Sequence, residues 1–414
     1  MTDRDKGAPA PEPAGTPAEV FVTFLKLGLT SFGGPVAHLG YFRAELVTRR
    51  RWLTDQAYAD LVTLCQFLPG PASSQVGFAL GLMRAGWLGA LAAFAAFTLP
   101  SALMLLAFAM TAGTMTGPVG TGALHGLKIV AVAIVAQAVW GMARALCPDR
   151  ARATIALGAV ALLAFLPGPF AMVGAILAGA LAGLTLGGDP DDTAGAERRH
   201  PMATPVSRPV ALSALSLFMG LLLLLPVLAG HGQALALIDS FYRAGALVFG
   251  GGHVVLPLLQ AEVVQPGWIG ADEFLAGYGA AQAVPGPLFT FAAYLGAAVE
   301  PEPHGIAGAA LALTAVFLPG FLILIGVLPF WDRFRAIAPA QAAMRGANAA
   351  VVGILGAALY SPVFTSAIGD ARDFALALAC FLLLVMWKAP PWAVVILAAV
   401  GGIALVLIQN SATG

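Results

Sequence analysis

The stretch FLKLGLTSFGG, at residues 24–34, returns later in the chain as FYRAGALVFGG, at residues 241–251. Three further blocks return in the same order: QFLPGP (66–71) as QAVPGP (282–287), FTLPS (97–101) as VFLPG (316–320), and HGLKIVAVAIV (125–135) as RGANAAVVGIL (345–355). The offset between the copies is almost constant, so the blocks indicate a duplicated half-chain unit. A duplicated apolar unit with Gly and Pro breaks at matching positions is typical of transporters that bind their substrate near the bilayer midplane.

The composition is that of a membrane protein. Of 414 residues, 59% are hydrophobic and only 10% are charged, and the mean hydropathy is +0.87, whereas soluble domains carry about 25% charged residues. The uncharged runs 85–124 and 153–188 exceed the roughly 20 apolar residues that one helical span needs. A transmembrane barrel would show short alternating segments instead. We therefore predict an all-α polytopic membrane protein.

Several functional classes lack their sequence signatures. The net charge is zero, so no basic patch indicates a nucleic-acid partner. The three cysteines, Cys65, Cys147 and Cys380, are scattered and form neither metal-ligand spacing nor a disulfide framework. No HExxH motif and no GxxxxGK[ST] phosphate loop occurs. We also find no nucleophile–base pair, so we expect no metal, no cofactor and no enzymatic activity.

The chain divides at its polar stretches. We expect a disordered N-terminal tail at 1–19, a first membrane domain at 20–186, a polar linker at 187–208, a connecting membrane segment at 209–236 and a second membrane domain at 237–410. Predicted spans of the first domain are 20–40, 86–112, 121–146, 153–166 and 169–186. Those of the second are 237–259, 304–330, 342–362, 373–388 and 390–408, and an extra apolar segment at 210–229 lies between the domains.

Each half also contains an apolar stretch broken in its middle by a PGP sequence. These stretches are 57–83, broken at Leu68–Pro71, and 274–299, broken at Pro285–Pro287. Proline removes a backbone donor and clashes with the preceding turn, so it should end a helix there. We expect each stretch to form a re-entrant hairpin of two short helices.

The distribution of Lys and Arg predicts opposite orientations for the two halves. The loop after the first span holds Arg43, Arg49, Arg50 and Arg51, whereas its counterpart at 260–273 holds no Lys or Arg. Basic residues accumulate on cytoplasmic loops, so the swap favours an inverted repeat. Counting every stretch from 153 to 229 as a crossing gives the wrong parity for inversion. We follow the charges, because counting is weakest for short spans.

Lys26 and Arg243 are cations at equivalent positions inside apolar segments. A buried ionisable residue costs about 2.5–3.5 kcal/mol on insertion scales and usually serves a function. The alternative is that each side chain snorkels to the interface. Lys128 lies deeper, and its counterpart is the neutral Asn348. Lys128 has two readings: an asymmetric role in substrate binding, or an ion pair with a carboxylate.

The glycine and PGP breaks are candidate binding elements. Gly33 and Gly34, and their counterparts Gly250 and Gly251, permit positive φ and close approach to a ligand, although small residues also serve close helix packing. A half-helix that starts after a PGP turn presents free N–H groups and a positive dipole end, which suits an anion. Gln66 and Gln282 precede the two turns and could add neutral donors, or bond between helices.

The remaining polar residues give weaker signals. His38 and His253 flank the glycine breaks at non-equivalent positions, and Asp60 and Asp239 lie near segment ends. A cation transporter would be expected to bury carboxylates. Since the repeated charges are positive and we expect few buried acids, the sequence favours an anionic substrate.

These motifs resemble the long, two-domain type of the chromate ion transporter (CHR) family. The resemblance rests on FLKLGLTSFGGPVAHL (24–39), WLTDQAY (52–58), QFLPGPASSQ (66–75), and the second copies FGGGH and QAVPGP, and it covers about residues 20–408. It implies a bacterial inner-membrane protein that exports chromate, with sulfate as a chemical analogue, and two homologous domains of opposite orientation. The second copy departs from the first at Gly252, opposite Pro35, and at Asn348, opposite Lys128.

The family's motif residues fall on Lys26, Gly33, Gly34, Pro35, Arg43, Gln66, Pro69, Gly70 and Pro71. With the repeated positions, the candidate substrate-binding residues are Lys26, Gly33, Gly34, Pro35, Arg43, Gln66, Pro69, Gly70, Pro71, Lys128, Arg243, Gly250, Gly251, Gln282, Pro285, Gly286, Pro287 and Asn348. The leading hypothesis is a secondary transporter in the lipid bilayer that exports chromate and confers chromate resistance. Sulfate or another oxyanion, taken up rather than exported, is the alternative within transport. A membrane scaffold without transport activity is the alternative from another class. A homodimer is left open.

Overall fold

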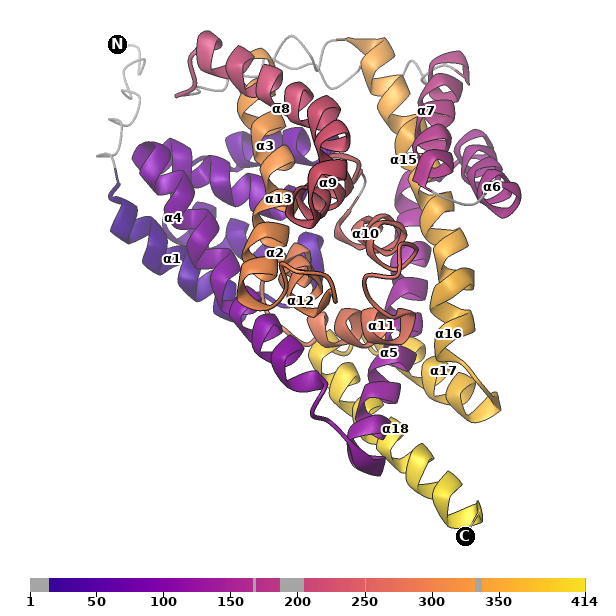
Figure 1. The fold of residues 1–414 in the computed structure, drawn as a ribbon. Helices are drawn as coiled ribbons and strands as arrows, with labels where there is room; N and C mark the ends of the chain where they lie inside the picture. Colours follow the sequence, from indigo (N-terminus) through magenta and orange to yellow (C-terminus); the bar gives the residue numbers. More distant parts are fainter. Residues whose placement is uncertain (1–14, 167–168, 187–204, 250, 332–336, 414) are drawn as a thin grey trace, which may run out of the picture.

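The computed structural model describes residues 15–166, 169–186, 205–249, 251–331 and 337–413, and these residues form helices and no strands (Figure 1). The helices of the first half are α1 (Pro17–Thr30), α2 (Gly34–Phe42), a π-helical turn (Arg43–Arg49), α3 (Asp55–Phe67), α4 (Ala72–Ala112), α5 (Gly117–Leu146), α6 (Arg150–Phe165) and α7 (Pro169–Leu186). Helix α8 (Arg208–Leu228) connects the halves. The second half contains α9 (Gln233–Ala246), α10 (Val255–Val263), α11 (Ala271–Ala281), α12 (Phe291–Ala298), α13 (Gly305–Val327), α15 (Ala338–Ala358), α16 (Thr365–Ala367), α17 (Ala371–Val385) and α18 (Pro391–Thr413).

The helices repeat as the sequence does. Helices α1, α2, α3, α5, α6 and α7 correspond to α9, α10, α11, α15, α17 and α18, and α4 corresponds to α12 and α13 together. Helix α4 turns sharply at Gly86, whose φ is +66°, and the chain turns at the equivalent Gly305, whose φ is +60°. The predicted duplication is therefore present in the fold.

The predicted spans 20–40 and 237–259 each consist of two short helices rather than one. The first is interrupted at Ser31–Gly33, where Gly33 and Gly34 have φ of +97° and +77°. The second is interrupted before Gly252, where Gly251 has φ of +149°. These left-handed conformations favour glycine and cannot continue a right-handed helix.

The predicted boundaries of the N-terminal tail and the linker are only partly testable. Helix α1 begins at Pro17, with the Thr16 hydroxyl accepting from the Glu19 N–H at its N-terminus, so the stretch predicted as a tail overlaps the helix. Residues 1–14 and most of the predicted linker at 187–208 lie outside the described residues.

The PGP sequences end helices, as predicted. Helix α3 ends at Phe67 and α4 begins at Ala72, while α11 ends at Ala281 and helical structure resumes at Leu288. Gly70 and Gly286 have φ of +115° and +101°. With 13 residues, α3 is about 20 Å long, less than the roughly 30 Å of a bilayer core. The first PGP turn joins α3 to Ala72–Arg84, the part of α4 before its kink at Ala85 and Gly86, and the second joins α11 to α12. Each of these four segments is too short to cross alone.

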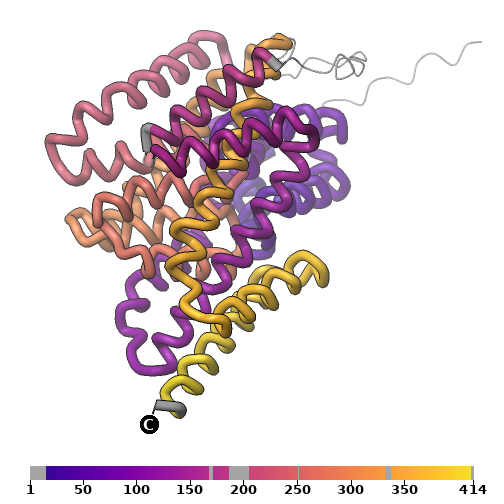
Figure 2. The backbone as a smooth tube through the Cα atoms, turned by 90° about the vertical axis from the view of Figure 1, so that its right-hand side faces the viewer, coloured from indigo at the N-terminus to yellow at the C-terminus, as the bar shows by residue number. Residues whose placement is uncertain are grey.

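The two halves exchange their C-terminal hairpins. Helix α18 packs against α5 of the first half, and α7 packs against α15 of the second. A Cβ on Gly126 would overlap the Ala398 carbonyl oxygen, and one on Gly346 would overlap that of Gly179, so only glycine permits either contact. The hairpin α17–α18 (yellow) lies at the opposite end of the molecule from α6–α7 in both views (Figures 1 and 2).

Among the described residues, six helices are long and apolar enough to span a bilayer. They are α4, α5, the extended α8 (208–231), α13, the extended α15 (338–367) and α18. The prediction of an all-helical, multi-pass membrane protein with two homologous halves is confirmed.

Candidate functional site

The two glycine breaks meet at the junction of the halves. A Cβ placed on Gly252 would lie 3.2 Å from Cγ of Pro35, and one on Gly34 would lie 3.9 Å from Nε2 of His253. Pro35 and Gly252 occupy equivalent positions in the repeat. Equivalent positions of the two halves therefore lie in contact where the glycine breaks meet.

Each PGP turn forms a hydrogen bond to the glycine break of the other half. The Gly70 N–H donates to the Val248 carbonyl oxygen at 2.8 Å, and the Gly286 N–H donates to the Ser31 carbonyl oxygen at 2.9 Å. Gly70 is equivalent to Gly286, and Ser31 to Val248, so equivalent residues of the two halves form the two hydrogen bonds. The two hydrogen bonds thereby bring both PGP turns and both glycine breaks together at the junction of the halves.

Gln75 and Ser101 contact these turns from neighbouring helices. The Gln75 side-chain amide donates to the carbonyl oxygens of Pro69, at 2.9 Å, and Gly320, at 2.8 Å. On the other side, a Cβ on Gly286 would lie 2.8 Å from Oγ of Ser101. The PGP turn of each half therefore packs against a long helix of the other half, α13 in one case and α4 in the other.

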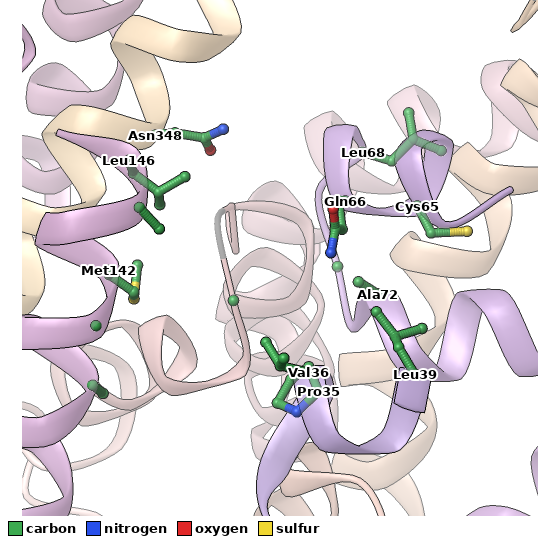
Figure 3. A pocket seen from close by; sticks show the side chains of 15 residues that line it. Pro35, Val36, Leu39, Cys65, Gln66, Leu68, Ala72, Met142, Leu146 and Asn348 are labelled. Atoms are coloured by element: carbon green, nitrogen blue, oxygen red, sulfur yellow. The ribbon is translucent and has the colours of Figure 1, made fainter. Parts of the chain in front are cut away.

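A first cavity of about 450 Å³ opens beside the crossed breaks (Figure 3). Figure 3 shows Asn348, Met142 and Leu146 on one wall and Gln66 on the other. The lining residues are Pro35, Val36, Leu39, Cys65, Gln66, Leu68, Gly70, Ala72, Ala138, Gly141, Met142, Ala145, Leu146, Gly251 and Asn348. Five predicted residues far apart in sequence therefore share one cavity: Pro35, Gln66, Gly70, Gly251 and Asn348.

A second cavity, of about 510 Å³, adjoins the first through the shared residues Ala138 and Gly141 of α5. It is lined by Gly33, Gly34, Ile134, Gln137, Ala138, Trp140, Gly141, Arg144, His253, Gln282, Leu384, Val385, Lys388 and Pro391. Three predicted residues, Gly33, Gly34 and Gln282, lie here. At about 30 Å³ per water, each cavity has room for a small oxyanion with part of its hydration shell.

The four predicted cations line neither cavity, and each is paired with a carboxylate. Lys26 donates to Glu45 at 3.0 Å, and Arg43 donates to Asp55 at 2.8 Å. Lys128 lies 3.1 Å from Asp272. Arg243 donates to Glu262 at 2.8 Å and lies 2.9 Å from Asp239. The alternative that Lys128 pairs with a carboxylate is confirmed, and a role of these cations in substrate binding stays a prediction.

The expectation of few buried acids is wrong. Glu45 and Glu262 are each only 8% exposed, and Asp60, Asp239 and Asp373 are buried as well. The two glutamates are themselves repeated: AELV at 44–47 returns as AEVV at 261–264. In both halves the acid follows its cation by 19 residues. This repeated spacing was a usable signal. Because buried acids accompany the buried cations, the sign of the buried charges does not by itself identify an anionic substrate.

The other predicted residues shape the turns. Pro69, Pro71, Pro285, Gly286 and Pro287 form the PGP turns beside the cavities and do not line them, and Gly250 lies outside the described residues. No sequence motif predicted a role for Arg144 or Lys388, and His253 gave only a weak signal. The offset that aligns His125 with Arg345 places Phe364 opposite Arg144, so the duplication carried no signal for that arginine.

Comparison with known proteins agrees with the duplicated architecture. Residues 18–184 and 235–403 each match the model of a family described as chromate transporter. The chain is 30% identical to a chromate transport protein of Pseudomonas aeruginosa over 365 residues, which cover 84% of this chain and 81% of that protein. It is 28% identical to a chromate transport protein of Cupriavidus metallidurans, with 83% and 82% covered, and 26% identical to an uncharacterized transporter of Methanocaldococcus jannaschii, with 76% and 77% covered. No solved structure matches.

Proposed function

The chain belongs to the chromate transporter family, and on that basis we propose that it exports chromate as a secondary transporter, through the two cavities beside its crossed glycine breaks. Family membership supports chromate as the transported substrate. We add three proposals to it. Transport runs outward, it is driven by gradients across the membrane, and it confers chromate resistance.

The observation that carries the proposal is the reciprocal crossing of the halves. The hydrogen bonds from Gly70 to Val248 and from Gly286 to Ser31 bring both PGP turns and both glycine breaks together, beside two adjoining cavities. Interrupted helices at the interface of two repeats are the common substrate site of secondary transporters. Non-helical backbone at membrane depth is tolerated where it lines a water-filled cavity.

The walls of the first cavity offer neutral donors to an oxyanion. The side-chain amides of Gln66 and Asn348 lie on opposite walls, and Ala72 lines the cavity as the first residue of α4. The free N–H groups of a helix N-terminus attract an anion through hydrogen bonds and the helix dipole. These groups would replace part of the hydration shell as the substrate passes.

We further propose that the halves lie in the membrane with opposite topology and that the PGP hairpins are re-entrant. Support comes from the swapped distribution of Arg residues in the loops, from hairpins too short to cross, and from the placement of α6–α7 and α17–α18 at opposite ends (Figure 2). Two inverted halves around one site can expose it to either side by rocking against each other.

The membrane potential would drive export. Moving one charge costs or releases about 2.3 kcal/mol per 100 mV, so an inside-negative potential of 100 mV favours the exit of a dianion by about 4.6 kcal/mol. The sequence contains no GxxxxGK[ST] loop, in keeping with transport driven by gradients.

Uptake of radiolabelled chromate into everted membrane vesicles tests the proposal. Vesicles that contain the protein should accumulate chromate faster than vesicles that lack it, and collapsing the potential with an ionophore should reduce the rate. A matched vesicle set with excess sulfate measures the preference between the two oxyanions. Equal uptake with and without the protein would contradict the proposed transport.

A further inference from the structure

We propose that the second cavity contains an oxyanion subsite in which Arg144 and Lys388 supply the positive charge and His253 supplies a neutral N–H donor. The inference rests on the proposed transport function and assigns charge recognition to residues other than the four predicted cations. Its ligand class is a tetrahedral oxyanion with two negative charges.

The charge balance of the second cavity singles out these residues. Among the described residues, its lining contains Arg144, Lys388, His253, Gln137 and Gln282, and no carboxylate. Neither Arg144 nor Lys388 makes an ion pair with any residue in the described part of the chain, in contrast to Lys26, Arg43, Lys128 and Arg243. A cation already paired with a carboxylate contributes little net charge to a ligand, so the unpaired cations of the cavity are the ones available to a dianion.

The hydrogen bond of His253 sets which ring nitrogen carries the proton. Its Nδ1 lies 2.7 Å from the hydroxyl oxygen of Tyr278, which is fully buried. A buried hydroxyl group must donate its proton to some acceptor, and among the described residues the structure offers Tyr278 only this nitrogen. The Tyr278 O–H therefore donates to Nδ1, which leaves the proton of the neutral imidazole on Nε2. Nε2 is the atom that lies beside Gly34, so it presents a donor at the cavity.

The subsite is built from both halves. Arg144 lies in the last turn of α5, in the first half, and Lys388 lies in the turn between α17 and α18, the hairpin that packs across onto α5 (Figure 1). Lys388 has φ of +52°, a conformation that is uncommon for a residue other than glycine. An anion held between Arg144 and Lys388 joins the two halves, so its binding favours the arrangement in which the two cations are close.

The two cavities differ in the charge of their lining residues, so we assign them different steps in substrate transport. In the part of the chain that the structure describes, no charged side chain lines the first cavity, whereas two cations line the second. Dipole ends supply only about half a charge each, which leaves a dianion under-compensated in the first cavity alone. The second cavity therefore selects and concentrates the dianion, and the first passes it on through neutral donors.

Binding to the purified full-length protein tests the subsite. The variants are Arg144→Gln, Lys388→Gln, their combination, and the charge-preserving pair Arg144→Lys and Lys388→Arg. The matched control is Arg372→Gln, which removes an exposed arginine at the start of α17, outside both cavities. Chromate, sulfate and the monoanion nitrate are titrated calorimetrically, and chromate uptake is measured in vesicles with the same variants.

The double Gln variant should bind chromate at least about tenfold more weakly, because it loses two charge-assisted contacts, and should raise KM more than it lowers kcat. The charge-preserving pair and Arg372→Gln should bind within about threefold of the wild type, and nitrate should bind more weakly than chromate. Tyr278→Phe, which frees the His253 tautomer, should weaken chromate binding severalfold without removing a charge from the cavity.

The outcomes separate the two proposals. Wild-type transport together with unchanged chromate affinity in the double Gln variant would overturn the subsite and leave the proposed function standing. A wild-type protein that neither binds nor transports chromate would overturn both. Since Arg144 and Lys388 are exposed, their replacement should not prevent folding. If the double variant nevertheless misfolds, the charge-preserving pair decides: a tenfold loss of affinity despite retained charges would contradict the account.

Discussion

Replacement of Arg243 by Gln should destabilise the protein far more than replacement of its repeat counterpart Lys26. The Arg243 side chain is 28% exposed, and its two carboxylate partners, Asp239 and Glu262, are 7% and 10% exposed. The variant Arg243→Gln leaves two largely buried carboxylates without a cation. Removing one partner of a buried ion pair costs about 3–5 kcal/mol, and we expect a loss of that size here.

Loss of the cation should cost less stability in the first half, although the equivalent ion pair is present there. The Lys26 side chain is 52% exposed, and its partner Glu45 also accepts from Arg49, at 3.1 Å, and from Arg50, at 2.9 Å. Lys26→Gln therefore leaves the carboxylate with two cations. Exposed ion pairs contribute about 0–1 kcal/mol, so the cost should stay near that range.

Reversible unfolding in mixed micelles, with circular dichroism as the readout, measures both free energies of unfolding. We expect Arg243→Gln to lose at least about 2 kcal/mol more than Lys26→Gln. The triple variant Arg243→Gln, Asp239→Asn, Glu262→Gln serves as the control, because it removes the uncompensated carboxylates and should recover most of the loss. Equal costs for the two single variants, or a triple variant no more stable than Arg243→Gln, would refute the reasoning.

Three further predictions follow from the contacts of the site. Gly70→Ala should abolish chromate uptake and lower the yield of folded protein, because φ is +115° and the new Cβ would lie 2.9 Å from Gly320; Gly113→Ala, whose Cβ meets nothing within 4 Å, should behave as the wild type in the same uptake assay. If Lys26 only positions α1, Lys26→Gln should leave chromate uptake per folded molecule near that of the wild type, because Arg49 and Arg50 still pair with Glu45, whereas an anion-binding Lys26 predicts the loss of most uptake. Asn348→Leu, which removes a neutral donor from the first cavity, should reduce kcat/KM for chromate about tenfold, and unchanged kinetics would remove Asn348 from the pathway.

The sequence predicted the elements of the site better than its charges. The duplication and the PGP breaks located the interruptions, because proline and left-handed glycine act on the local backbone. Gln66, Gln282 and Asn348 were found in the same way, as polar residues at repeated or aligned positions. Each lines a cavity in the structure.

The ion pairs could not be derived from local patterns. Glu45 reaches Lys26 across the glycine break, 19 residues away, a separation that no helical period explains. The acids could have been found only by noticing that Glu45 and Glu262 repeat with their cations. Arg144 and Lys388 could not be predicted from the sequence for a different reason. They line the same cavity because α17–α18 packs onto α5 of the other half, and such an exchange depends on tertiary packing rather than on local sequence.

The most direct test of the central claim, two oppositely oriented halves that cross at one site, is the side of the membrane on which equivalent loops lie. Gln56→Cys places a thiol at an exposed position in the first turn of α3, and Gly270→Cys places one at an exposed position directly before α11. The background is Cys147→Ser, which leaves only the buried Cys65 and Cys380. A membrane-impermeant maleimide is applied to intact cells and to everted vesicles. The account predicts that one thiol is labelled only in cells and the other only in everted vesicles. Labelling of both thiols from the same side would contradict it.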